Sequence, residues 1–168
     1  DNRDDRGNIR NRAETGGDEG FVLRGYQADL HSRPEYFGML YGEKMNKRGI
    51  IATRHQRVVC GEDEEKEVLA EAAPSTELDS KEWNTLRVVA VGNRVVHLVN
   101  GVVTVDVTDN HPLSPESGKL GLQLHAGAPM KAVFRDLKLR PLSKEEGPAV
   151  LEKAASAFPG GETAAVES

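Results

Sequence analysis

The sequence predicts an all-β sandwich or barrel. Short runs in which apolar and polar residues alternate recur along the chain, separated by turn-forming residues. Gly92-Asn93 and Asn100-Gly101 each join two such runs, and these residues tolerate the positive φ that tight hairpin turns require. Helical periodicity is almost absent, and no segment of about 20–50 residues repeats, so a propeller or a solenoid is not expected.

The first half of the chain carries weaker strand signals. Residues 1–20 are charged and glycine-rich, which predicts an irregular segment, either a mobile loop or a broken strand. Four strands are expected next, at residues 21–30, 36–41, 49–52 and 55–60. The acidic stretch 62–73 ends at Pro74 and is expected to form a surface loop or a turn of helix.

The second half carries the strongest β signals. Hairpin strands are expected at residues 83–91, 94–99 and 102–107, and two further strands within 117–142, joined by a Gly-Ala-Pro turn. In the first of these two, the leucines at positions 120, 122 and 124 alternate with Gln123 and His125. We expect the leucines to share a buried face and the polar pair to project from the other face.

The composition changes after Leu142. Ser143, followed by Glu145 and Glu146, predicts a helix start, and the weak helix ends before Pro159, with a disordered tail or linker from Gly160. The chain is therefore divided into an irregular segment (1–20), a β-sandwich domain (21–142) and a weak helix with a flexible tail (143–168).

Composition and charge limit the classes of function. The chain has 168 residues, 38% of them hydrophobic, and a formal net charge of −5 with acidic and basic residues mixed. Without a basic stripe and interleaved aromatics, nucleic acid is not an expected partner. The single Cys60 excludes an internal disulfide and a cysteine-based zinc cluster. No apolar run reaches the length of a membrane span, and the charged opening is typical of a mid-domain segment or a processed start rather than a signal peptide.

Polar side chains on two expected strands are the candidates for chemistry. Gln27 and Asp29 share one face of their strand, as Gln123 and His125 do of theirs. Amides, carboxylates and imidazoles can bind the paired hydroxyls of a sugar, and a carboxylate near a histidine can act as general acid and base. Loops that could rim this face carry Glu43, Arg48 and Arg54. The alternative for each residue is an ordinary solvated side chain.

The five histidines form no metal-binding motif. There is no HExxH or paired ligand spacing, and no P-loop, GxGxxG or GxSxG that would favour nucleotide or serine-hydrolase chemistry. His97 shares a face with Val95 and Val99, so it is either a core histidine bonded to a backbone carbonyl or part of the polar surface. His31 and His111 lie beside turn residues and are expected to be solvated.

Five stretches of the sequence occur in a characteristic order. They are LRGYQADL (23–30), YFGMLYGE (36–43), RGIIA (48–52), WNTLRVVAVGNRVVHLVNGVVTVDVTD (83–109) and GKLGLQLHAGAPMKAVFRDLKL (118–139). Together they resemble the 3-keto-disaccharide hydrolases, a family also described as 3-keto-glucoside 1,2-lyase and 3-keto-2-hydroxyglucal hydratase domains. The resemblance covers residues 20–142 of this chain.

The resemblance implies a concanavalin-like jelly-roll β-sandwich that handles small carbohydrates, often in extracytoplasmic bacterial proteins. The implied substrates are glycosides oxidised to a ketone at position 3, which acidifies the proton on the neighbouring carbon. A base removes this proton, the aglycone leaves by elimination, and water then adds back. A divalent metal can assist such chemistry in the family, but no motif here specifies one, so the cofactor stays open. The alternative function is a non-catalytic carbohydrate-binding module on the same sandwich.

Position by position, the resemblance implies roles for individual residues. His125 and Asp29 are expected to be acid/base or ligand residues, with Glu43 as the next catalytic candidate. The expected substrate-binding residues at matched positions are Gln27, Gln123, His97 and Tyr41. Arg48 is expected to bind substrate as well, because its loop could rim the polar face. Asn100 also matches a motif position, but its Asn-Gly turn is a sufficient structural reason for it.

The start of the chain departs from the family pattern. Family domains begin with several strands and a segment resembling GNSGIxxR, which residues 7–12 match imperfectly. A sandwich without its opening strands would leave sheet edges unpaired and apolar surface uncovered. Three readings follow: an inactive fragment or interaction domain, a sandwich completed by a partner, or a shortened version of the fold.

Overall fold

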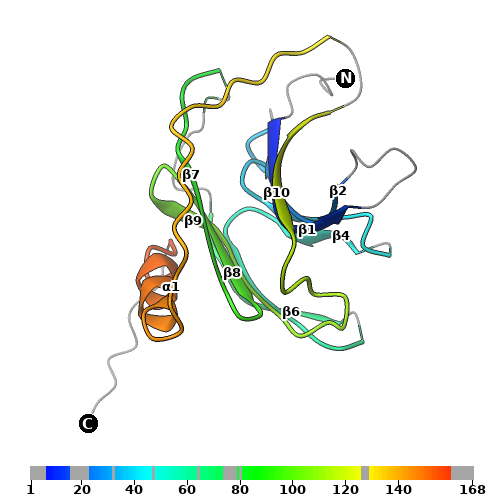
Figure 1. Cartoon of the computed structure of the whole chain (residues 1–168). Helices are drawn as coiled ribbons and strands as arrows, with labels where there is room; N and C mark the ends of the chain where they lie inside the picture. Colours follow the sequence, from blue (N-terminus) through cyan, green and yellow to red (C-terminus); the bar gives the residue numbers. More distant parts are fainter. Residues whose placement is uncertain are drawn as a thin grey trace.

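The chain folds into two five-stranded sheets and one helix within the part that the structure describes (Figure 1). This computed structural model describes residues 7–15 (backbone only), 23–31, 33–46, 48–63, 65–73, 79, 81–125 and 129–159. The prediction of an all-β sandwich with a short C-terminal helix is confirmed. The tail expected from Gly160 lies outside the described residues.

The first sheet is antiparallel and has the strand order β10-β1-β2-β3-β4. Its strands are β1 (Gly7–Thr15), β2 (Leu23–Leu30), β3 (Leu40–Glu43), β4 (Gly49–Ala52) and β10 (Lys119–Leu124). Because β1 pairs with both β2 and β10, the sheet brings two segments far apart in the sequence, near residues 27 and 123, to the two sides of β1. These are the segments that carry the candidate polar residues.

The second sheet has the order β6-β5-β9-β8-β7. Its strands are β5 (Gln56–Cys60), β6 (Lys66–Glu71), β7 (Leu86–Val91), β8 (Arg94–Val99) and β9 (Val102–Asp109). The turns that join β7 to β8 and β8 to β9 have positive φ at Gly92 (+55°), Asn100 (+51°) and Gly101 (+83°), as their sequences predict. Asn100 also accepts the Thr85 amide through its side chain at 2.9 Å, which is a structural role.

Apolar side chains cover both faces of the second sheet. Towards the first sheet, the main core gathers Tyr26, Leu40, Ile51, Val58, Val95, Val105 and Val107. On the other face, helix α1 (Gly147–Ala155) packs through Leu151 and Ala154 against Val96 and Val103. The helix follows a turn in which the Ser143 and Glu146 side chains each accept the other's backbone N–H, at 3.1 and 3.2 Å. Strands that are buried on both faces carry apolar residues at successive positions, which explains the runs of valine in β8 and β9.

Two predicted elements are wrong, and a third is right in one of its two alternatives. Residues 7–15 form β1, whose register shifts between Asn11 and Ala13, so the broken strand agrees with the structure here and the loop does not. Pairing on both sides supports this strand although it has no apolar alternation of its own. Residues 66–71 form β6, a largely exposed edge strand whose charged sequence concealed it. Residues 36–38 form a turn where the strand 36–41 was expected to begin, and β3 begins only at Leu40.

The second strand expected within 117–142 does not form. Residues 129–142 run without sheet pairing beside β7 (Figure 1), where the Arg135 guanidinium lies 3.9 Å over the Trp83 ring. Leu122 faces the core side of the first sheet, since it shares a row with Ile9 and Ala28. The leucines of β10 are nevertheless 46–58% exposed, so their predicted burial is wrong: within the described residues, the second sheet does not extend over this edge.

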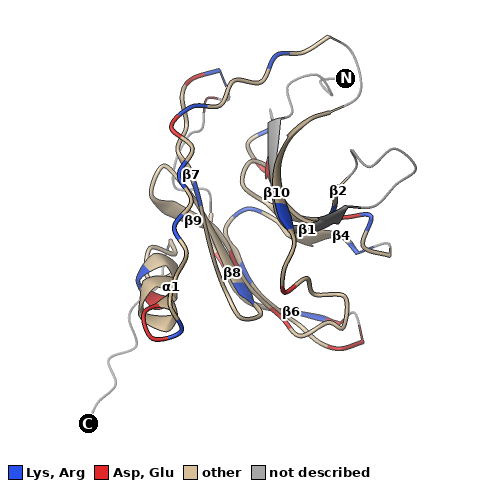
Figure 2. Ribbon diagram, viewed as in Figure 1, with Lys and Arg blue, Asp and Glu red and all other residues tan. Residues whose placement is uncertain are grey.

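Acidic and basic residues are interspersed along the ribbon (Figure 2). No helix in the described part of the chain is long and apolar enough to cross a membrane.

Candidate functional site

One face of the first sheet carries the candidate polar residues. Along β2, Tyr26 and Ala28 point into the core, so Gln27 and Asp29 lie on the opposite face. The backbone of Asn8 in β1 lies opposite both Asp29 and Gln123, which places these two residues in one row on one face. Gln27 in turn lies opposite Tyr41 of β3. The strand register alone therefore gathers an amide, a carboxylate and a phenol from distant parts of the sequence.

These residues line a cavity of about 300 Å³. Its lining consists of Gln27, Asp29, His31, Tyr36, Met39, Tyr41, Glu43, Ile50, Gln123 and His125. All three expected catalytic candidates, Asp29, Glu43 and His125, thus share one cavity with three of the expected binding residues. Their chemical roles remain predictions, but their proximity is a property of the fold.

The cavity combines buried and accessible polar groups. Gln27 and Asp29 are only 5% and 4% exposed, whereas Glu43, Gln123 and His125 are half-buried. Met39 and Ile50 add apolar surface. A few convergent polar groups on a partly apolar wall are typical of small-ligand sites.

His31 also lines this cavity, although its position beside turn residues predicted a solvated side chain. It is buried, and its Nδ1 accepts the Arg33 backbone N–H at 2.9 Å. With Nδ1 as the acceptor, the ring proton of this tautomer lies on Nε2. His31 continues the alternation of Gln27 and Asp29, and this signal could have found it. Tyr36 lies against the His31 ring edge, 5.4 Å between centroids, and has no such signal because it lies in a turn.

His97 does not reach the cavity. It is completely buried between the sheets, where its Nδ1 bonds the Gly38 carbonyl at 3.2 Å, and burial lowers its pKa to about 4. The structure therefore agrees with the first alternative, a core histidine bonded to a backbone carbonyl. The expectation that His97 contacts substrate disagrees with this placement. The sequence could not show it, because both faces of β8 are buried and alternation alone does not tell which face points towards the other sheet.

The two arginines expected near the site also lie elsewhere. Arg54 is buried, and its Nη1 donates to the Pro34 carbonyl at 3.3 Å. Arg48, expected to bind substrate, instead pairs with Asp109 at the end of β9, with Nη1–Oδ2 and Nη2–Oδ1 distances of 2.6 and 2.9 Å. A guanidinium so fully engaged with a carboxylate is not available to a ligand in the cavity.

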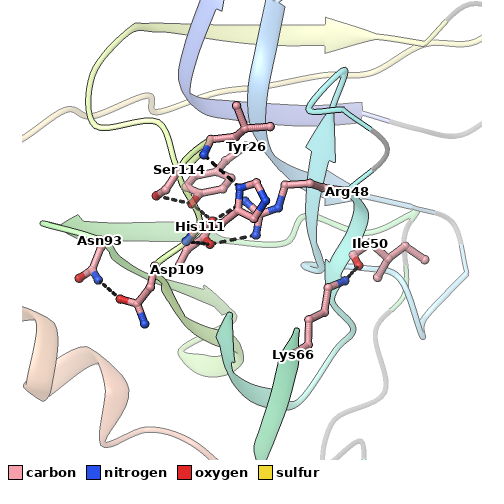
Figure 3. A network of polar contacts seen from close by, with 10 residues as sticks. Tyr26, Arg48, Ile50, Lys66, Asn93, Asp109, His111 and Ser114 are labelled. Carbon is pink, nitrogen blue, oxygen red and sulfur yellow. Dashed lines mark hydrogen bonds and ion pairs between the residues drawn. The ribbon is translucent and has the colours of Figure 1, made fainter. Parts of the chain in front are cut away.

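The Arg48–Asp109 pair belongs to a network that joins the two sheets (Figure 3). The Tyr26 hydroxyl on β2 donates to Asp109 and lies 2.9 Å from the Ser114 hydroxyl. The backbone N–H of His111 donates to Asp109 at 3.2 Å, and burial of His111 differs from its expected solvation. Since Tyr26 and Gln27 are consecutive, this network fixes the strand from which Gln27 and Asp29 reach the cavity.

A second hollow of about 560 Å³ lies beside this network, lined by Asp109, His111 and Ser114 among others. We prefer the smaller cavity as the site, because the buried carboxylate of the larger one is already neutralised by Arg48. Within the described part of the chain, no three His, Cys, Asp or Glu side chains are arranged to hold a metal ion.

Carboxylates, imidazoles and amides around one cavity of an all-β sandwich are the polar groups of a small-ligand site. The chain belongs to the 3-keto-alpha-glucoside-1,2-lyase-like domain family, whose model matches residues 8–140. This match confirms the resemblance seen in the sequence and supports a carbohydrate-related function. A search of curated proteins gave no match.

Proposed function

We propose that this protein is an enzyme that cleaves 3-keto-glycosides by elimination followed by hydration. The observation that carries the proposal is the shared cavity of Asp29, Glu43 and His125 in a member of this family. Two carboxylates and an imidazole provide the acids and bases that the proton transfers of elimination and hydration need. Gln27 and Gln123 supply planar amides that suit sugar hydroxyls.

The reaction begins at the carbon next to the ketone. A base removes the proton from carbon 2, and the electrons of that bond pass into an enolate of the 3-ketone. As the enolate collapses, the bond from carbon 1 to the aglycone oxygen breaks, and an acid protonates the departing oxygen. Water then adds at carbon 1 while a proton returns to carbon 2, so the net change is hydrolysis.

We assign these proton transfers to Asp29 and His125, with Glu43 as the next candidate. Asp29 is buried on the same face of β2 as Gln27. His125 follows directly after β10 and is half-buried. His31 lines the same cavity, so we place it near the ketone, where negative charge develops in the enolate. Each well-placed acid or base contributes about 10²–10⁴-fold to the rate.

The test is turnover of a 3-keto-glucoside, followed by mass spectrometry. We expect the natural sequence to release the aglycone, and Asp29→Asn and His125→Ala each to slow release at least about 100-fold with unchanged thermal unfolding. Retention of turnover by both variants would contradict the residue assignment. Binding of the keto-glucoside without any release would favour the alternative, a carbohydrate-binding module.

A further inference from the structure

The Gly38 carbonyl receives two side-chain hydrogen bonds from the opposite sheet. Thr104 Oγ1 of β9 donates to it at 2.9 Å, and His97 Nδ1 of β8 lies 3.2 Å from it. All three residues are buried. Because a carbonyl only accepts, His97 carries a proton on Nδ1, and burial, which lowers the pKa of His97 to about 4, keeps the ring neutral at pH 7. A polar contact so fully removed from water is stronger than its surface equivalent.

Only glycine permits this contact. Gly38 has φ of +85°, a region that disfavours other residues. A Cβ at this position would lie 2.6 Å from Thr104 Oγ1 and 2.9 Å from Val99 Cγ2. Both the backbone conformation and the close approach of the two sheets therefore require a glycine where the carbonyl meets Thr104.

The same glycine is bonded to the cavity wall. The Gly38 N–H donates to the Asp29 carbonyl at 2.7 Å, and the Asp29 N–H donates to the Met39 carbonyl at 3.2 Å. The Met39 N–H donates to the Tyr36 carbonyl at 3.1 Å. Asp29, Tyr36 and Met39 all line the cavity. Gly38 thus links the buried side chains of the second sheet to three residues of the candidate site.

We propose that His97 and Thr104 are positioning residues, which hold Gly38 and thereby fix Asp29, Tyr36 and Met39 in the geometry that the cavity needs. We call the three residues His97, Thr104 and Gly38 the latch. Its effect on catalysis rests on the proposed function, whereas its effect on the backbone does not. The latch gives the buried His97 a role that does not involve contact with substrate.

The first experiment follows amide hydrogen exchange in the ligand-free protein. Thr104→Val keeps the shape of the side chain and removes the hydroxyl, and we expect exchange at Gly38 and Met39 to accelerate about five- to tenfold. Thr104→Ser retains the donor and should keep exchange within about twofold of the natural protein. Thr108→Val, on the same strand outside the latch, is the matched control. Equal acceleration at Val105 would show a general loss of stability and would overturn the proposal.

The second experiment measures steady-state kinetics on a 3-keto-glucoside. We expect Thr104→Val and His97→Leu to raise KM about fivefold or more at a temperature where both are folded. His97→Asn, whose side-chain N–H lies near the position of Nδ1, should recover most of the loss. An unchanged KM in both donor-deleted variants would overturn the positioning role. If the natural protein shows no turnover, the proposed function fails, and hydrogen exchange alone decides on the latch.

Discussion

Arg48 and Asp109 form a doubly hydrogen-bonded ion pair that is removed from water, with side chains 3% and 1% exposed. Burial alone would lower the pKa of Arg48, but the hydrogen bonds and the charge of Asp109 outweigh this effect and raise it. The pair joins the segment before β4 to the end of β9, so it connects the sheet of the candidate site to the second sheet. Its integrity is a condition for the geometry of the cavity.

Asp109→Asn should destabilise the protein by about 3 kcal/mol or more, because it leaves the Arg48 guanidinium buried without a counter-charge. Urea unfolding at pH 7 measures this change. Asp136→Asn is the matched control: Asp136 is 81% exposed and pairs with Arg135 at 3.6 Å, so its loss should change stability by less than about 0.5 kcal/mol. Similar losses of unfolding free energy in the two variants would show that the buried ion pair stabilises the protein no more than the exposed one.

Tyr26→Phe should make stability less sensitive to alkaline pH. Burial, followed by the hydrogen bond to Asp109, raises the pKa of the Tyr26 hydroxyl. The unfolded chain ionises near pH 10 while the folded protein keeps the proton, so this stability is present below pH 10 and lost above it. Between pH 9 and 11 the variant should lose about 1 kcal/mol less than the natural protein. Parallel declines would contradict the raised pKa.

His97→Asn should flatten the acid side of the stability profile. Burial lowers the folded-state pKa of His97 to about 4, whereas an unfolded histidine titrates near 6.5. The stability that neutral His97 provides is therefore complete above pH 6.5 and declines as the pH falls towards 4. From pH 7 to 4.5 the natural protein should lose about 2 kcal/mol more than the variant. Thr108→Val, as control, should retain the natural slope. Equal declines in His97→Asn and the natural protein would contradict the lowered pKa.

Gly38→Ala and Gly101→Ala form a matched pair. Their φ angles are +85° and +83°, so the conformational penalty of a Cβ is nearly the same, about 1 kcal/mol. A Cβ meets nothing within 4 Å at Gly101, but at Gly38 it meets Thr104 and Val99. We expect Gly38→Ala to be the more destabilising by about 2 kcal/mol or more in thermal unfolding. Equal losses would mean that the two sheets are not closely packed at Gly38.

Alternation and turn chemistry predicted much of this fold because they depend on neighbouring residues. The faces of Gln27 and Asp29, and of Gln123 and His125, follow from the pleat, and the two hairpin turns follow from their glycines and asparagines. The roles of Arg48 and His97 could not be predicted in this way. Their partners, Asp109 and Gly38, lie about 60 residues away and meet them only through the fold.

The prediction that the β10 leucines are buried was wrong for a related reason. Alternation identifies the side of the sheet to which Leu122 points, but burial depends on whether another element covers that side. β6 was missed because an exposed edge strand needs no apolar face. The local sequence therefore predicts to which side of a sheet a residue points. Which strands pair, and whether another element covers that side, depend on the whole chain.

The central claim is cleavage of a 3-keto-glycoside by elimination and hydration in the cavity of Asp29 and His125. The most direct measurement is conversion of a 3-keto-glucoside in D₂O, with the early product analysed by NMR and 3-keto-glucose in D₂O without enzyme as the control for spontaneous exchange. We predict deuterium at carbon 2 of the released sugar at each turnover, and loss of both release and label in Asp29→Asn. Release of an unlabelled sugar, or none at all, would contradict the account.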